Sequence, residues 1–226
     1  IKSCADRGIN ILRIPISTEL LLEWKNGEAE KAGNFSNSPD WTFNPDLVNE
    51  DGTAMNTLQV MDKLMVLCKE YGVKVLIDCH SAKADNSGHV HPMWYNTEAG
   101  ITTQDWIDGW KFIVERYKND DTFIAADLEN EPHGKADEEE YAKWDDSQDV
   151  NNWKYAAEEC AKAILEINPN MLILVEGIEQ NPKEGYTYDS PVQKTNEGYA
   201  YKMVLDISGG RDRIFNISKK GTTFTE

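Results

Sequence analysis

Four short apolar segments, each followed by polar residues, constrain the fold of this chain more than any other feature. They cover residues 9–15, 73–77, 122–126 and 171–175. Amphipathic helical patterns lie between them, at residues 53–71, 102–117 and 147–167. Because neighbouring parallel strands need a crossover helix, this alternation predicts right-handed βαβ units and an α/β fold. Residues 1–7 are predicted to end a helix, and residues 18–44 to form a loop.

Charged and polar residues gather where the predicted strands end. Arg13 lies near the end of the first segment, residues 78–80 follow the second, residues 127–133 the third, and Glu176 the fourth. Carboxylates just past a buried strand cost desolvation and mutual repulsion, which a fold tolerates where charges do chemistry. The functional edge of a (β/α)8 barrel is such a place. A doubly wound sheet would bring a Gly-rich first turn, which is absent. We therefore predict the barrel class.

The bulk composition limits the partners of the chain. Its 226 residues suffice for one domain, and the net charge of −17 comes from 40 acidic against 23 basic residues. That excess argues against nucleic acid and anionic membrane surfaces as partners. No apolar run of membrane-spanning length and no signal peptide is apparent in the chain. The oligomeric state is not indicated.

Cysteines and histidines give weaker signals. Cys4, Cys68, Cys79 and Cys160 form no zinc-ligand spacing. Buried thiols are favoured, and a Cys4–Cys68 bridge is the alternative. His89 and His91 are spaced for a metal, but they lie in a polar loop with no third ligand in phase. We expect no metal and no cofactor.

The strand-end motifs resemble glycoside hydrolase family 5, the retaining β-glycanases of the (β/α)8 clan, and within it the endo-β-1,4-glucanases. The resemblance rests on residues 10–15, 76–80, 127–133 and 168–177, in that order and spacing. It covers about residues 1–177. A (β/α)8 barrel needs about 250 residues, and the first and last strands are not recognisable, so an incomplete TIM barrel is expected. We expect one catalytic domain over 1–226, with a hairpin or a rearranged segment at 178–226.

The resemblance implies a role for four polar residues. Glu131, in the Asn-Glu-Pro signature, is the expected general acid/base, and Asn130 the expected partner of the sugar 2-hydroxyl. Arg13 is expected to lie under the site and keep the nucleophile ionised. His80 is expected to hydrogen-bond the sugar or the carboxylates.

The nucleophile is not placed by the resemblance. Retaining hydrolysis needs a second carboxyl group about 5–5.5 Å from the acid/base. In the family it is a Glu at the end of the seventh strand, and this chain stops at Glu226 before that point. Glu176 also ends a buried strand, but the family's glucanases carry a Glu there without using it as nucleophile.

The tryptophans are assigned either to substrate binding or to the hydrophobic core. The resemblance implies that Trp41 and Trp94 are sugar platforms, whose flat apolar faces stack on a pyranose ring. Trp106, Trp110 and Trp153 have helical spacing and are predicted to be core.

The resemblance thus implies a secreted, retaining endo-β-1,4-glucanase that acts on a cellulose-type β-glucan polysaccharide, with secretion inferred from the insoluble substrate. One alternative is a same-fold mannanase or xyloglucanase. Another is a non-catalytic, carbohydrate-binding fragment, and a third is a metal-dependent hydrolase that uses Asp78, His80, His89 and His91.

Overall fold

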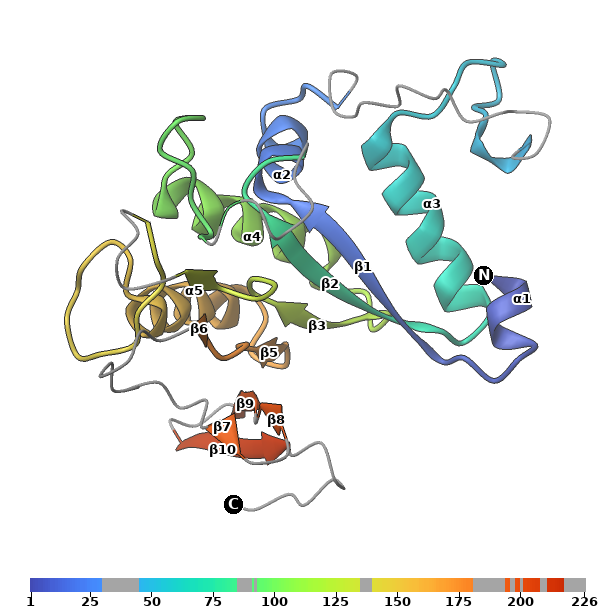
Figure 1. Cartoon of the computed structure of the whole chain (residues 1–226). Helices are drawn as coiled ribbons and strands as arrows, with labels where there is room; N and C mark the ends of the chain where they lie inside the picture. Colours follow the sequence, from blue (N-terminus) through green and yellow to red (C-terminus); the bar gives the residue numbers. More distant parts are fainter. Residues whose placement is uncertain are drawn as a thin grey trace.

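A parallel four-stranded sheet is the centre of the computed structural model (Figure 1). The structure describes residues 1–29, 45–84, 91, 93–134 and 140–180, and the strand residues 194–195, 198–199, 201–207 and 211–217. The sheet has the order β1-β2-β3-β5, formed by β1 (Ile11–Ser17), β2 (Lys74–Ser81), β3 (Phe123–Asp127) and β5 (Leu172–Leu174). All three pairings are parallel, so the four predicted strands and their parallel arrangement are confirmed.

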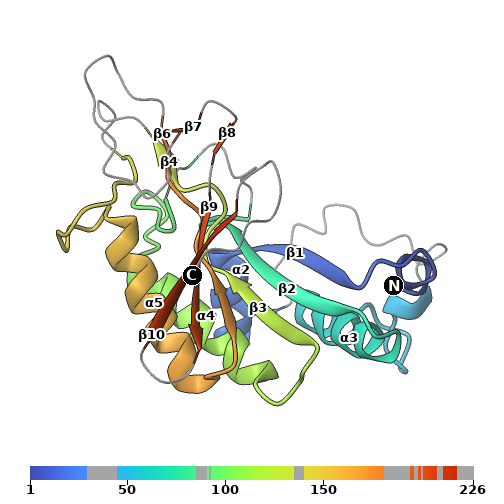
Figure 2. The same cartoon turned by 90° about the horizontal axis from the view of Figure 1, so that it is seen from below.

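Helices connect the strands as βαβ units require. They are α1 (Lys2–Ala5), α2 (Thr18–Lys25), the 3-10 helix η1 (Pro45–Leu47), α3 (Thr57–Glu70), α4 (Thr103–Tyr117) and α5 (Trp153–Ile167). Figure 2 shows α3, α4 and α5 along one face of the curved sheet. Capping boxes begin α3 at Asn56 and α4 at Thr102, which explains where these two helices start. None of the helices in the described part of the chain is long and apolar enough for a membrane crossing.

Helices α2 and α5 differ from the prediction for local reasons. Residues 18–25 are helix α2 rather than loop, because the Ser17 hydroxyl caps it by accepting from the Leu20 N–H at 3.1 Å. Helix α5 begins at Trp153 rather than at 147. The preceding segment stays a loop because the buried Asn152 amide donates to the backbone carbonyls of Asp145 and Ser147.

The remaining strands are short or lie near the end of the chain. They are β4 (His133–Gly134), β6 (Glu179–Gln180), β7 (Lys194–Thr195), β8 (Gly198–Tyr199), β9 (Tyr201–Ile207) and β10 (Arg211–Ile217). The β9 and β10 strands form an antiparallel pair, and β9 lies against β5 (Figure 1).

Four fully buried tryptophans fill the core beside the sheet. Trp94, Trp106 and Trp153 pack with ring centroids 5.0–6.2 Å apart. The indoles of Trp106 and Trp110 both donate to the carbonyl oxygen of Leu128, at 3.1 and 3.2 Å. The core positions predicted for Trp106, Trp110 and Trp153 are confirmed. These indoles also fix the main chain just beyond β3.

Candidate active site

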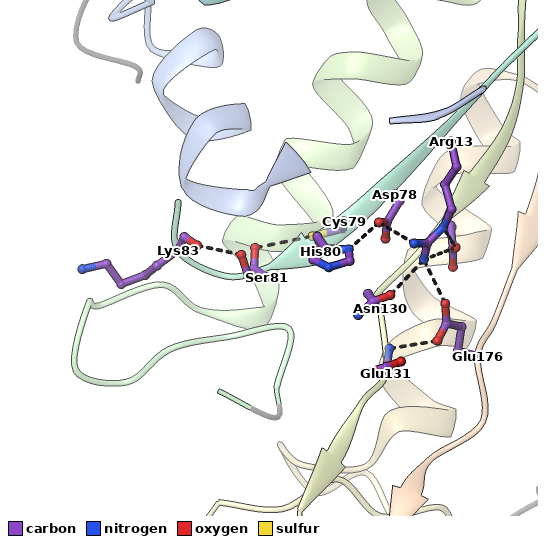
Figure 3. A network of polar contacts seen from close by, with 10 residues as sticks. Arg13, Asp78, Cys79, His80, Ser81, Lys83, Asn130, Glu131 and Glu176 are labelled. Atoms are coloured by element: carbon purple, nitrogen blue, oxygen red, sulfur yellow. Dashed lines mark hydrogen bonds and ion pairs between the residues drawn. The ribbon is translucent and has the colours of Figure 1, made fainter. Parts of the chain in front are cut away.

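Polar side chains from all four parallel strands meet at the carboxyl edge of the sheet (Figure 3). Arg13 comes from β1, and Asp78 and His80 come from β2. Residues 127–131 lie at and beyond the end of β3, and Glu176 follows β5. Parallel strands end at the same edge, so residues far apart in sequence become neighbours here.

Arg13 is the centre of this cluster. Its Nε and Nη2 donate to Asp127 Oδ2 at 2.9 and 2.8 Å, and Nη1 lies 2.9 Å from Asp78 Oδ2. Nη2 also donates to Asn130 Oδ1 and to Glu176 Oε1, each at 3.0 Å. The planar guanidinium therefore links three carboxylates and one amide from three other segments, in the forked geometry that suits arginine.

Asp78 orients His80. The two residues are two apart in β2, so their side chains lie on the same face of the sheet, and His80 Nδ1 is 2.6 Å from Asp78 Oδ2. An ionised Asp78 can only accept, so this contact requires the proton on Nδ1 and leaves Nε2 as the other polar atom of the ring. Burial raises the pKa of Asp78, and the contacts from His80 and Arg13 oppose that rise.

Asp127 and Glu176 are two carboxyl groups that both accept from Arg13. Burial raises the pKa of Asp127 to about 6 despite its ion pair with Arg13. Burial, followed by repulsion from Asp127, raises the pKa of Glu176 to about 7. The two carboxyl groups repel each other when both are ionised, so they titrate as an interacting pair that retains protons near neutral pH.

Glu131 has an unusual backbone conformation at this edge. Its φ is +47°, and it is the only non-glycine residue with positive φ in the described ranges. Its backbone N–H donates to Glu176 Oε2 at 2.9 Å. Its side chain is close enough to Asp78 for the two carboxyl groups to repel each other.

Glu129, the acid between Asp127 and Glu131, is only 2% exposed. Its carboxyl group is buried against the Cys79 thiol, and burial raises its pKa well above the ordinary value. All four cysteines are free, with Cys68, Cys79 and Cys160 buried and Cys4 half-buried, so the buried-thiol interpretation is favoured over a Cys4–Cys68 bridge.

The structure brings together five of the residues singled out from the sequence: Arg13, His80, Asn130, Glu131 and Glu176. Asp78 and Asp127 are also part of the cluster, although sequence reasoning gave neither a role in the glucanase site. The two-residue spacing of Asp78 and His80 within a strand was the signal that could have found Asp78.

The prediction that Trp94 is a sugar platform was wrong. Its side chain is 0% exposed, and its indole N–H donates to Thr103 Oγ1 at 3.0 Å. The ring packs between Trp106 and Trp153, so it has no face for a substrate. Trp41, the other predicted platform, lies outside the described residues.

The alternative hypothesis was a metal site formed by Asp78, His80, His89 and His91. His89 lies outside the described residues, and Asp78 and His80 contact each other directly. In the ranges that the structure describes, no group of three or more His, Cys, Asp or Glu side chains is arranged to hold a metal ion.

Known proteins resemble this chain over most of its length. Endoglucanase G of Acetivibrio thermocellus is 52% identical over 204 residues, which cover 84% of this chain and 36% of that protein. Endoglucanase B of the same organism is 40% identical over 228 residues, or 97% of this chain and 38% of the relative. A cellotetraose complex of an endocellulase variant from Pyrococcus horikoshii is 28% identical, with a TM-score of 0.62 over 81% of this chain and 45% of the other.

The chain thus spans little more than a third of these two curated relatives and less than half of the solved structure. The structural likeness identifies the parallel sheet and its helices as part of a (β/α)8 barrel. The family model for cellulases, glycosyl hydrolase family 5, matches residues 1–203. With that match and these relatives, the chain belongs to glycosyl hydrolase family 5.

Proposed function

We propose that this protein is a retaining endo-β-1,4-glucanase that hydrolyses cellulose-type β-1,4-glucan. The observation that carries the proposal is the convergence of Arg13, His80, Asn130 and Glu131 at one edge of the sheet. The relatives described above are named endoglucanases, and the solved structure holds cellotetraose, a short β-1,4-glucan.

Glu131 is the general acid/base of this proposal. It protonates the leaving oxygen in the first step and removes a proton from water in the second. Repulsion from the Glu131 carboxylate contributes to the raised pKa of Asp78, which shows that the two side chains lie close together at this edge.

Asn130 is oriented to bind the sugar. Its Oδ1 accepts from Arg13, so its Nδ2 group is the part of the amide left to donate. A hydrogen bond from this group to the 2-hydroxyl would strengthen in the oxocarbenium-like transition state. His80, held by Asp78 through Nδ1, presents Nε2 to the same region.

The nucleophile has to be a second carboxylate about 5–5.5 Å from the acid/base. We do not assign it to Glu176, because both oxygens of that carboxyl group already accept from the protein. Oε1 accepts from Arg13, and Oε2 accepts from the Glu131 N–H. Cellulose is too large and insoluble to enter a cell, so the proposal includes secretion and a role in polysaccharide degradation.

The test is the release of reducing sugar from carboxymethylcellulose by the full chain. Glu131→Gln is expected to lower the rate by about 10²–10⁴-fold, the usual contribution of general acid–base catalysis. Glu70→Gln, at the exposed end of α3, is the matched control and should keep the rate. Proton NMR should detect the β-anomer of the product first.

Three outcomes would overturn parts of the proposal. Activity that persists in Glu131→Gln removes Glu131 from its role, and an α-anomer formed first excludes retention. Cellulose binding without any sugar release would favour a non-catalytic binding protein.

A further inference from the structure

We propose that Glu176 is a positioning residue whose carboxylate holds the main chain of Glu131 in the left-handed conformation and so sets the direction of the Glu131 side chain. The inference deepens the proposed function, because its catalytic consequence rests on Glu131 as the acid/base. Its structural content does not depend on activity.

The conformation of Glu131 needs external support. A side chain at positive φ costs on the order of 1–2 kcal/mol, and such strain persists only where the surroundings enforce it. Pro132 follows directly and disfavours the right-handed helical region for Glu131. Contacts must therefore select the left-handed region, at φ +47°, over the extended one.

Three hydrogen bonds fix the peptide units around this residue. The Asn130 N–H donates to the Cys79 carbonyl at 2.8 Å, which joins the segment to β2. His133 Nδ1 lies 2.6 Å from the Glu131 carbonyl oxygen. The Glu131 N–H itself donates to Glu176 Oε2 at 2.9 Å. The last bond acts on the N–H of the strained residue itself, and its acceptor is a side chain that can be changed without altering the backbone.

Glu176 is itself held in place at two points. Its Oε1 accepts from Arg13 Nη2 at 3.0 Å, and its backbone carbonyl accepts from the buried Trp153 indole at 2.8 Å. The side chain is only 19% exposed. Glu176 is therefore a fixed acceptor, which is what a residue needs in order to impose a conformation on a neighbouring segment.

The backbone conformation matters because it directs the Glu131 side chain. Rotation of Glu131 toward extended φ would aim its Cα–Cβ bond elsewhere, away from the glycosidic oxygen that it must reach. A displacement of about 1 Å at a reacting group can cost about 100-fold in rate. Removal of the Oε2 acceptor should leave the protein folded and Glu131 misdirected.

The first test reads the hydrogen bond directly. Labelling with ¹³C-carbonyl asparagine and ¹⁵N-glutamate selects the Asn–Glu pairs at 49–50, 130–131 and 196–197. The Glu131 signal is the one lost in Glu131→Gln. Its amide proton should shift downfield as Glu176 ionises, with a midpoint near the pKa of about 7 for that carboxyl group.

Variants assign that titration. Glu176→Gln should abolish it, and Asp127→Asn should keep it with a lower midpoint, because repulsion from Asp127 raises the pKa of Glu176. Glu176→Asp keeps the charge but shortens the side chain by one methylene group. The Glu131 amide proton should therefore no longer shift when this carboxyl group titrates. No such titration in the wild-type protein, or an unchanged one in Glu176→Gln, overturns the proposal.

The second test uses two substrates. A cello-oligosaccharide needs its leaving oxygen protonated, whereas a dinitrophenyl cellobioside hardly does. Glu176→Ala, which leaves no side-chain acceptor for the Glu131 N–H, should lower kcat/KM for the oligosaccharide at least ~10-fold and leave kcat/KM for the aryl glycoside within about 2-fold. Equal losses on both substrates would indicate general damage and overturn the positioning role. An inactive wild-type protein would reject the proposed function and leave the NMR test decisive for Glu176.

Discussion

Arg13 pairs with three carboxylates at once, and this excess of negative charge governs the chemistry of the cluster. Asp78 and Asp127 are almost completely buried, whereas the Arg13 side chain is 38% exposed. One cation cannot neutralise three acids, and burial opposes their ionisation. The pKa values of Asp127 and Glu176 are accordingly raised, to about 6 and about 7. Near neutral pH, the cluster therefore holds protons that ordinary carboxyl groups would release.

Removal of this cation should cost more stability at high pH than at low pH. At pH 8, Arg13→Met leaves Asp127 and Glu176 ionised without their common partner. At pH 5 both groups bind protons, so less charge is left uncompensated. The expected loss in the free energy of unfolding is about 3 kcal/mol at pH 8, at the low end for broken buried pairs because Arg13 is partly exposed. Urea unfolding at both pH values measures it.

Lys69→Met is the matched control for Arg13→Met. Lys69 pairs with Asp120 and Asp121 at the surface, where its side chain is 56% exposed. Its removal should cost much less stability than the removal of Arg13, and the cost should be the same at both pH values. An Arg13→Met cost that does not change between pH 5 and pH 8 would contradict the argument from shared protons.

Individual site residues were predictable to different degrees. Arg13, His80, Asn130 and Glu131 could be placed from the sequence, because the ends of parallel strands meet at one edge. Trp94 could not be placed, since its burial depends on indoles that α4 and α5 bring from later in the chain. A loop position with flanking polar residues says nothing about those partners.

At the scale of elements, strand β2 extends further than its apolar residues indicate. Asp78 is paired with Pro15 on one side and with Asp127 on the other, so the sheet continues through the polar residues. Polar residues usually mark the end of a buried strand, so the sequence predicts that the strand ends before Asp78. Here the contacts of Arg13 and His80 replace the solvation that the Asp78 carboxylate loses.

Helices α2 and α4 pack closely at Gly109, and this contact gives a prediction. A Cβ at Gly109 would lie 3.0 Å from the Leu21 Cβ and 3.3 Å from its Cδ1. Overpacking of this kind costs about 1–3 kcal/mol, and the gain of about 1 kcal/mol from replacing a helical glycine offsets part of it. Gly109→Ala should therefore lower the free energy of unfolding in urea, by about 1 kcal/mol.

A double-mutant cycle with Leu21→Ala tests whether this contact is the cause. The Leu21 substitution removes Cδ1 and Cγ, which also face Gly109. The double variant should be more stable than the sum of the two single changes predicts, by at least ~0.5 kcal/mol. A stabilising effect of Gly109→Ala alone would show that α2 yields easily to the added methyl group.

At the scale of the whole molecule, side chains of the core also hold the main chain of the site. Indoles from α4 hold the Leu128 carbonyl, and the Trp153 indole from α5 holds the Glu176 carbonyl. The two segments that carry Glu131 and Glu176 are thus fixed from the interior. Helical spacing predicted that these tryptophans were core, but the carbonyls that they bind depend on tertiary packing, which no local pattern encodes.

The raised pKa values of the carboxyl pair also determine how stability depends on pH. Between about pH 4 and pH 7, native Asp127 and Glu176 bind protons that the unfolded chain has released. The native state then binds more protons than the unfolded state, so the free energy of unfolding falls as pH rises through this window. Asp145 acts oppositely at lower pH, because hydrogen bonds from Ser147 lower its pKa to about 2.

Stability should therefore be highest near pH 4–5 and should decrease toward pH 8, where the carboxyl pair is ionised. Glu176→Gln removes one of the two responsible groups. Between pH 5 and pH 8, the free energy of unfolding of this variant should therefore fall about 1–2 kcal/mol less than that of the wild-type protein. Urea unfolding at pH 5, 6, 7 and 8 measures both profiles. Glu70→Gln controls for the loss of one negative charge at an exposed helix end. A wild-type stability that rises from pH 5 to pH 8 alongside an identical Glu176→Gln profile would mean that this pair holds no shared proton in the folded protein.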